Sequence, residues 1–422
     1  MKIFYTIILC LIALPALSFG QSFTIEGEFR PRSEFRDGFR KPLADSLSPG
    51  FITFQRTRLS VDYRTNSLNA RVTLQDARIW GQDDTKGSTV RVGVFEAWVE
   101  MLIVPGLSAQ FGRQGLSYDD QRLFSVGNWS NTGTVHDALF FKYRETGFQA
   151  HLGFAYNNTN DTLFAYPYAV KSMYQTMGLF WAGKQLSNGG TLSVLAVGEG
   201  LQKLTTPRPT LGRFTVGANL VYPTDSSNFG GMLTAYNQSG RDANFKILYA
   251  YLLAAKASYK TTPFTSSIGM DYYSGTAFDA DTARKNFTFN KLYGLSHSFN
   301  GPMEYWATLP AGGLVDYYAG TMFKADPWWL SITGHVFNLA QTMKDKYKNL
   351  IGKNIGSEAD LVLNYQWSKE VSFQGGWSMY FPTTATKQVN SMFNTQKNLI
   401  ALKRPQWVYL MVSIKPVFFK NL

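Results

Sequence analysis

Hydrophobic and polar positions alternate with a period of two along most of this chain. The clearest segment covers residues 23–36, where one parity is mostly apolar and the other is polar or charged throughout. Successive side chains of a β-strand point to opposite faces, so this segment predicts a strand with one apolar and one polar face.

The same alternation recurs from one end of the chain to the other. Further segments cover residues 56–64, 68–75, 95–101, 213–222, 358–367 and 407–418. Amphipathic segments of about ten residues are typical of membrane barrels, whose lipid-facing side must be apolar. Strands can satisfy all backbone groups inside a bilayer only by closing on themselves. We therefore expect an all-β fold, a closed antiparallel transmembrane β-barrel. A soluble two-layer fold would need helices or turn-rich connections between so many repeats.

Turn sequences and longer polar stretches separate the predicted strands. Short turns are expected at residues 105–106, 187–190, 223–228 and 239–242, and long loops at 115–134, 279–312, 341–356 and 383–405. A strand with its connection takes about 22 residues, so the chain accommodates roughly 18 strands, with 16 as the alternative. In such barrels the long loops face outside and the short turns face the periplasm. Residues 21–422 are expected to form this single barrel domain.

The N-terminus has the features of a Sec signal peptide. Lys2 is followed by a short apolar run and then by small residues, which predicts cleavage after Gly20 and export to the outer membrane of a Gram-negative cell. The run is too short for a stable membrane span. Cys10 is the only cysteine, so the mature chain has no disulfides, thiol catalysis or cysteine metal sites. The final strand, ending near Phe418 and Phe419, resembles the signal recognised by the barrel-insertion machinery.

The amino-acid composition indicates which classes of molecule the protein is expected to bind. The formal net charge is +12 and aromatic residues make up 15% of the chain. An exported chain without a nucleic-acid motif is not expected to bind nucleic acid. Anionic solutes and lipopolysaccharide phosphates are better partners for these charges. Tryptophans near predicted strand ends fit either interfacial belts or buried positions; they are Trp306, Trp328, Trp329, Trp367, Trp377 and Trp407.

Arginine and lysine are segregated along the chain. Nearly all basic residues between positions 21 and 145 are arginines, whereas lysine dominates afterwards. The arginine fork holds carboxylates in fixed geometry, which lysine does not. Most of these arginines share the polar parity with carboxylates such as Glu28 and Glu96, so a ladder of ion pairs across the lumen wall is expected. The pairs could stiffen the barrel, or excess arginines could guide an anionic solute through a constriction.

Several motifs resemble the alginate-export-type outer-membrane barrels, in a Bacteroidetes-like form. The N-terminal motifs are residues 29–34 (FRPRSE), 55–59 (QRTRL), 75–81 (QDARIWG), 112–114 (GRQ), 118–123 (YDDQRL), Trp129 and 136–137 (HD). Farther along, residues 271–275 (DYYSG) and 289–306 (FNKLYGLSHSFNGPMEYW) are similar to the same group. The C-terminal third matches only as a generic barrel.

The resemblance implies a monomeric barrel with an arginine-rich lumen that passes an acidic polysaccharide by passive diffusion. The implied lining is Arg30, Arg32, Arg56, Arg58, Asp76, Arg78, Arg113, Asp119 and Arg122. Glu96, which alternates with apolar neighbours on the polar parity, completes the predicted pore lining.

No enzymatic activity, cofactor or metal is expected. His136-Asp137 near a serine lacks the nucleophile elbow of a hydrolase. The histidines His136, His151, His297 and His335 are too scattered to predict a metal site, and His335 is expected to face the lumen. Asp119-Asp120 could hold Ca²⁺ but is more simply a solvated pair. The alternatives to an anion channel are a general porin and a structural barrel in a surface or secretion complex.

Overall fold

The structure is a computed structural model of the chain. It describes residues 21–44, 46–83, 91–161, 163–164, 168, 174–202, 210–224, 227–295, 297–392, 399 and 404–421. The predicted signal peptide, residues 1–20, lies outside the described residues.

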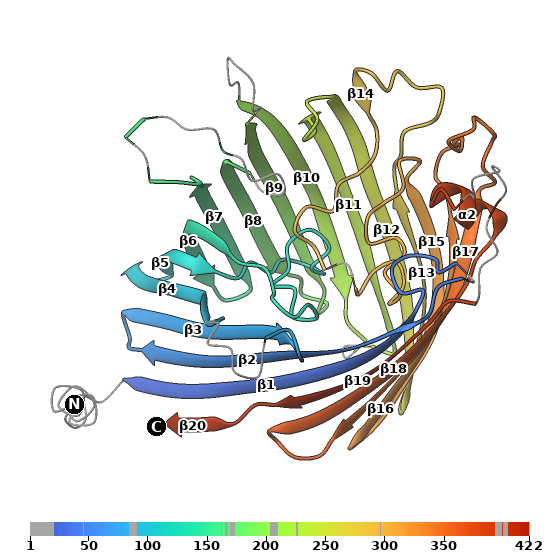
Figure 1. The fold of residues 1–422 in the computed structure, drawn as a ribbon. Helices are drawn as coiled ribbons and strands as arrows, with labels where there is room; N and C mark the ends of the chain where they lie inside the picture. The colour runs from blue at the N-terminus through green and yellow to red at the C-terminus, as the bar shows by residue number, and fades with distance from the viewer. Residues whose placement is uncertain are drawn as a thin grey trace.

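Long antiparallel strands make up nearly all of the fold (Figure 1). The strands of the first half are β1 (Ser22–Asp37), β2 (Gly50–Arg64), β3 (Leu68–Ile79), β4 (Gly93–Val104), β5 (Leu107–Gln114), β6 (His136–Glu145), β7 (Phe148–Tyr156), β8 (Thr176–Gln185), β9 (Thr191–Gln202) and β10 (Thr210–Tyr222). Those of the second half are β11 (Phe229–Arg241), β12 (Ile247–Thr261), β13 (Phe264–Tyr273), β14 (Lys285–Asn286), β15 (Leu314–Ala325), β16 (Trp328–Asn338), β17 (Asn354–Gln366), β18 (Val371–Phe381), β19 (Gln406–Ile414) and β20 (Val417–Lys420). A short helix, α2 (Thr384–Val389), lies between β18 and β19.

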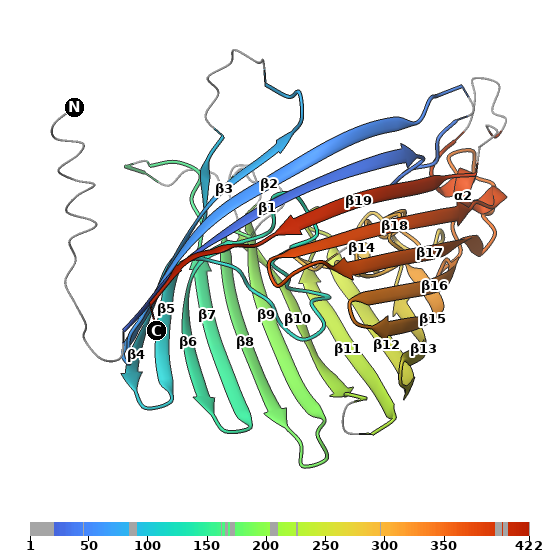
Figure 2. The ribbon, with the colours of Figure 1, turned by 90° about the horizontal axis from the view of Figure 1, so that it is seen from below.

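The wall is a closed barrel of 18 antiparallel strands, as predicted. Each strand pairs with its neighbours in sequence, and β1 pairs with both β2 and β19, which closes the sheet (Figures 1 and 2). The two remaining strands, β14 and β20, are not counted among the 18 strands of the wall. β20 continues β19 along β1, with Thr24 opposite Lys420, while the two-residue β14 pairs with β12 inside a long connection.

The two faces of the wall carry the opposite side chains to those of a soluble protein: apolar outside and polar inside. Large apolar side chains such as Phe29, Leu59 and Val72 are exposed on the outer face, where lipid covers them. Polar and charged side chains of the opposite parity point inward and are often buried, for example Glu34 and Arg56. Among the described residues, no helix has the length and apolar character needed to cross a membrane.

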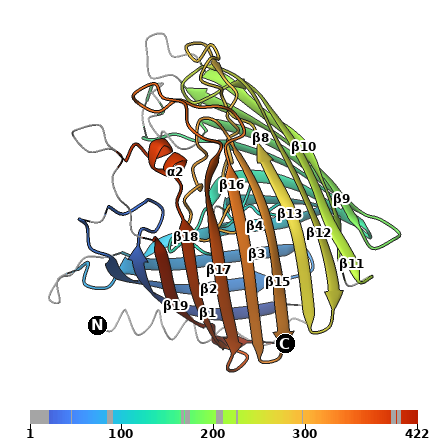
Figure 3. The same ribbon diagram turned by 90° about the vertical axis from the view of Figure 1, so that its right-hand side faces the viewer.

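The connections differ in length between the two ends of the barrel. Turns of two to six residues join the strands at the end where β1 begins and β20 ends, whereas most of the connections at the other end, including the one with α2, are longer (Figure 3). Two long connections fold back into the lumen: residues 115–135, here the inner loop, and residues 274–313, here the long loop (Figure 1). These loops position the candidate site.

Two local predictions need correction. Residues 239–242 were expected to form a turn, but β11 runs to Arg241 because its pairing with β10 and β12 continues that far. Phe95 was placed on the apolar face. A register shift in the pairing of β3 with β4 leaves Phe95 as an extra residue, and its side chain is buried.

The tryptophans divide between the two environments considered for them. Trp328, Trp367 and Trp377 are exposed on the outer surface, as interfacial residues would be. Trp306 and Trp407 are instead buried inside the barrel, where their indole N–H groups donate to Tyr380 and Glu34.

Candidate functional site

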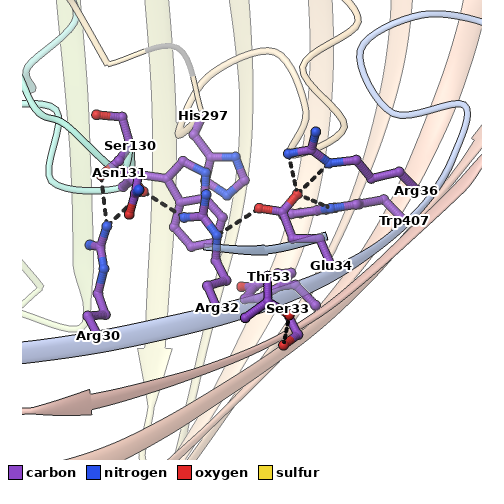
Figure 4. Close-up of polar contacts among 12 residues, drawn as sticks. Arg30, Arg32, Ser33, Glu34, Arg36, Thr53, Ser130, Asn131, His297 and Trp407 are labelled. Atoms are coloured by element: carbon purple, nitrogen blue, oxygen red, sulfur yellow. Dashed lines mark hydrogen bonds and ion pairs between the residues drawn. The ribbon is translucent and has the colours of Figure 1, made fainter. Parts of the chain in front are cut away.

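The arginines of β1 and β2 converge inside the barrel. Period-two alternation places Arg30, Arg32, Arg56 and Arg58 on the inward face, and Figure 4 shows Arg30 and Arg32 on the opposite side of β1 from Ser33. Arg30, Arg32 and Arg56 are buried. Their side chains reach the tip of the inner loop rather than open water.

Some of the expected ion-pair ladder is present. Arg56 Nε donates to Glu28 Oε1 at 2.6 Å, and Glu34 accepts from Arg32 and Arg36, each at 2.8 Å. Trp407 Nε1 donates to the same Glu34 carboxylate at 3.0 Å. Arg30 and Arg58 have no ion pair among the described residues. Arg58 instead lies over the Phe95 ring, 3.7 Å from its centroid.

Asp119 anchors the inner loop to the far wall. Its carboxylate accepts from Trp181 Nε1 at 2.8 Å, Ser193 Oγ at 2.6 Å and Tyr236 OH at 2.7 Å. These donors come from β8, β9 and β11, so one side chain ties the loop to three strands. Glu96 holds the start of the same loop by accepting from the Gly115 N–H at 3.1 Å.

Arg122 is buried inside the barrel, where, among the described residues, it contacts three polar side chains. Its guanidinium pairs with Asp271 at 2.6 Å and Asp120 at 2.9 Å, and donates to Tyr273 OH at 2.8 Å. Burial alone would lower the pKa of Arg122, but Tyr273, Asp271 and Asp120 raise it well above its usual value. The Asp119–Asp120 pair is therefore not simply solvated, contrary to the expectation from the sequence: both carboxylates accept hydrogen bonds that hold the loop.

The long loop packs on the inner loop through both backbone and rings. The Tyr293 N–H donates to Leu123 O at 2.9 Å, and the Leu295 N–H donates to Gln121 O at 3.0 Å. At the other contact Trp129 stacks on His297, with centroids 3.8 Å apart and planes 3° apart. The two loops thus form one layer across the lumen.

Three of the ten predicted lining residues lie elsewhere. Asp76 is paired across the sheet with Thr57, and Arg78 with Gln55, on the same outward face as exposed Leu59 and Leu74. Arg113 lies opposite Asp137 and forms an ion pair with it at 2.9 Å, also on the outward face next to exposed Phe111 and Leu139. The prediction that these three line the pore is corrected by the register. The other seven lie inside the barrel.

The interior on either side of the loop layer is hollow. On the long-loop side is a cavity of about 840 Å³, the outer cavity, lined by Arg32, Arg36, Arg40, Trp129, Ser130 and Asn131 among others. On the short-turn side is a cavity of about 540 Å³, the arginine cavity, lined by Arg30, Arg56, Arg58, Arg71, Lys415 and Asn128 among others. The tip of the inner loop separates the two.

A third cavity faces the opposite wall. This acidic cavity of about 630 Å³ is lined by Asp120, Asp271, Asp316 and Asp360, together with His335, Arg122 and Lys256 among others. His335 faces the lumen, as expected, and its Nδ1 lies 3.0 Å from Asp316. The lumen therefore carries basic groups on the wall of β1 and β2 and acidic groups on that of β13, β15 and β17. In the described part of the chain, no three His, Cys, Asp or Glu side chains are grouped to hold a metal ion.

No separate role was predicted for Trp129 or His297, although both occur in the sequence motifs. Trp129 lines both the outer and the acidic cavities, and Arg32 lies 4.2 Å from its ring centroid. An isolated tryptophan in a polar stretch, preceded by Gly127 and Asn128, was the available signal. Its partner His297 lies far along the chain, and nothing in the local sequence pairs them.

Residues 17–155 match the alginate export family. This alginate export match confirms the predicted resemblance to the family. It covers the N-terminal motifs, from β1 to nearly the end of β7, including the arginine strands and the inner loop. Among curated proteins none matches the chain.

Solved structures match over nearly the whole length. OccAB1 of Acinetobacter baumannii has a TM-score of 0.63 at 11% identity, covering 94% of this chain and 97% of that chain. OccAB4 of the same organism has a TM-score of 0.64 at 10% identity, covering 96% and 100%. OpdK of Pseudomonas aeruginosa, solved with vanillate, has a TM-score of 0.58 at 11% identity, covering 93% and 99%. At these identities the likeness shows the fold. Together with this fold, the alginate export match over residues 17–155 supports an outer-membrane channel for solutes.

Acidification is expected to loosen the contact between the two loops. Burial lowers the pKa of His297 below its usual value of 6.5, and Arg32 acts in the same direction, outweighing the Glu304 carboxylate, 3.2 Å away, which raises it. His297 is therefore neutral when stacked, and a conformation that exposes it has the higher pKa. Protonation favours the exposed conformation, so the open probability of the channel should rise as the pH falls below about 6.5. Single-channel recording at pH 7 and pH 5 measures this, and His297→Gln should remove the dependence. The same rise in the variant would assign it to other groups.

Proposed function

We propose that this channel passes carboxylate-bearing solutes, namely acidic polysaccharide or oligosaccharide, by passive diffusion along the arginine wall. The observation that carries the proposal is the cluster of four inward arginines beside two cavities, of which Arg30 and Arg58 make no ion pair with a described residue. Guanidinium groups bind carboxylates through paired, charge-assisted hydrogen bonds. A row of such groups on one wall offers a chain of uronates successive sites without trapping it at one.

The asymmetry of the lumen supports the same function. Arginines line the β1 and β2 side, whereas the opposite cavity combines Asp316 and Asp360 with Lys256 and with Asp271 paired to Arg122. A polyanion is attracted more strongly to the arginine wall than to this mixed wall, which orients it along the arginines. The region of the alginate export match contains this basic wall and the inner loop.

A general porin is the second candidate. It is favoured by the hydrogen bonds that Arg30, Arg32 and Arg56 already make to the inner loop, since arginines engaged in structure need not select solutes. A purely structural barrel would leave the loop layer sealed and would conduct no ions.

The deciding experiment is single-channel recording in a planar bilayer under a salt gradient, with oligogalacturonate then added to one side. We expect an anion-selective reversal potential and concentration-dependent block by the uronates. Replacing Arg30 and Arg58 by Gln removes two lumen charges without leaving an ion-paired carboxylate behind. Each replacement should weaken uronate block roughly tenfold, the loss of one charge-assisted hydrogen-bonding group.

The outward arginines supply a matched control. Arg78→Gln with Arg113→Gln changes the net charge by the same amount on the other face of the wall. This control should leave selectivity and block unchanged. Equal effects of the two pairs would mean that the overall charge, and not the lumen wall, sets the selectivity. A pore that is non-selective and indifferent to uronates would identify a general porin.

A further inference from the structure

The tip of the inner loop, residues 128–132, occupies the arginine cluster with its own backbone. Three successive carbonyls, those of Asn128, Trp129 and Ser130, accept hydrogen bonds from lumen arginines. Arg30 donates to all three, with Nη2 2.7 Å from Ser130 O. Arg32 Nη1 is 2.6 Å from Trp129 O.

Two further arginines complete the contact. Arg56 Nη1 lies 3.1 Å from Ser130 O and 3.2 Å from Asn128 O. Arg58 Nη1 lies 3.2 Å from Asn128 Oδ1, and its Nη2 lies 3.4 Å from Thr132 O. Four cations therefore converge on a tip that carries no formal charge.

Neutral carbonyls are poor substitutes for an anion at such a place. A carboxylate adds the attraction between two full charges to its hydrogen bonds with a guanidinium, whereas a carbonyl offers only a dipole. Arg30 and Arg58 have no ion pair, and the Arg30 Nε is buried without a hydrogen-bond partner among the described residues. The positive charge of the cluster is thus only partly balanced by carboxylates. A carboxylate entering the cluster would bind more strongly than the carbonyls it replaces.

The tip is also shaped as a separable unit. The Thr134 N–H donates to Val126 O at 2.7 Å and closes the base of the turn. Gly127 and Gly133, with φ of +63° and +80°, stand at its two ends in the left-handed region that glycine adopts without strain. The rest of the loop is held separately by Asp119 and Arg122, so the tip can leave while the loop stays anchored.

The tip of the inner loop lies between the outer cavity and the arginine cavity. Asn128 lines the arginine cavity, whereas Trp129, Ser130 and Asn131 line the outer cavity. The tip is therefore part of the partition between the two. If it moves away, the two cavities become continuous along the arginine wall.

We propose that residues 128–132 are a displaceable internal occupant of a carboxylate-binding site, and that the solute's own carboxylates open the channel by replacing the loop carbonyls on Arg30, Arg32, Arg56 and Arg58. This inference rests on the proposed function and deepens it, since it makes the acidic solute both cargo and opener. The competing explanation is a permanent clamp, in which the arginines fix the tip and the solute passes elsewhere.

The test is amide hydrogen exchange of the full-length protein in detergent micelles, followed over residues 127–133 at constant ionic strength. Oligogalacturonate is compared with an uncharged maltooligosaccharide of equal length. We expect the uronate to increase exchange in this segment several-fold and the neutral sugar to leave it unchanged. Exchange in the anchored residues 119–123 should change with neither.

Two variants of the tip sharpen the result. Asn128→Asp replaces one atom and puts a carboxylate beside Arg58 from the loop itself, so the uronate concentration giving half-maximal exchange should rise roughly tenfold. Asn131→Asp adds the same charge to the same tip, but its amide faces the backbone carbonyls of Gln55 and Arg78. It should not strengthen the clamp.

The outcomes separate the two proposals. Unchanged exchange in a protein that remains anion-selective and uronate-blocked overturns the displaceable tip and leaves the proposed function intact. Equal responses to Asn128→Asp and Asn131→Asp would also overturn it. Absence of both selectivity and exchange response overturns the two together.

Discussion

Arg122→Met is expected to release both inward-folded loops and to raise single-channel conductance severalfold. The guanidinium holds Asp120 of the inner loop against Asp271 of β13, and all three groups are at least partly buried. Removing one partner of a buried charge network leaves uncompensated carboxylates and is destabilising by roughly 3–5 kcal/mol. The barrel itself should persist because its strands are paired independently of the loops.

Conductance in planar bilayers and limited proteolysis of the folded protein measure this release. New cleavage should occur within residues 115–135 and 274–313. The double variant Arg122→Met with Asp271→Asn is the control, because it removes a carboxylate together with its partner and should restore part of the closed state. Wild-type conductance and an unchanged cleavage pattern in Arg122→Met would show that the backbone contacts alone hold the layer.

The barrel was predictable because its signal is local and repeated. A lipid-facing strand must alternate whatever its neighbours are, so segments such as residues 23–36 carry the information within themselves. The same parity argument correctly places Arg30, Arg32, Arg56 and Arg58 inside. Strand number followed from chain length and loop spacing.

The three misplaced residues show where motif resemblance overrode parity. Asp76 shares the parity of Val72 and Leu74, and Arg113 that of Phe111, so strict alternation puts them on the outward face. These residues were assigned to the lumen because charged side chains are expected to face water rather than lipid. Near the ends of strands, however, ion pairs such as Arg113–Asp137 can lie outside, where the bilayer gives way to water.

The loop layer could not be predicted at all. The partner of Arg30 lies 98 residues away and is the backbone carbonyl of Asn128, which has no sequence signature. Asp119 and Arg122 were correctly placed inside, yet their role is to anchor a loop. That role depends on donors to Asp119 from β8, β9 and β11, and on the Asp271 carboxylate of β13, which accepts from Arg122. Contacts of this kind join residues that are far apart in sequence, so they can be identified only in the closed barrel.

Trp129→Ala should also open the lumen, by a different route. The indole fills the junction of the outer and acidic cavities, stacked on His297 and edge-on to Trp407 and Tyr409. Alanine leaves that volume empty and removes the ring under the Arg32 guanidinium, 4.2 Å away. Removing a fully buried aromatic ring commonly costs roughly 3–5 kcal/mol; Trp129 is half-buried, so the closed arrangement should lose part of that amount. We expect a higher baseline conductance and longer open times in bilayer recordings at pH 7.

Trp129→Phe separates the ring from its size. Phenylalanine keeps a flat face for His297 and a π-system for Arg32, so the loops should stay closed and only a modest rise in conductance should follow. If alanine and phenylalanine gave equal conductance, stacking would not hold the loops and the arginine–carbonyl contacts would have to do so alone. If neither changed it, the ions would cross the loop layer away from Trp129. A graded response, alanine well above phenylalanine, places the narrowest point of the channel where the basic wall, the acidic cavity and the two loops meet.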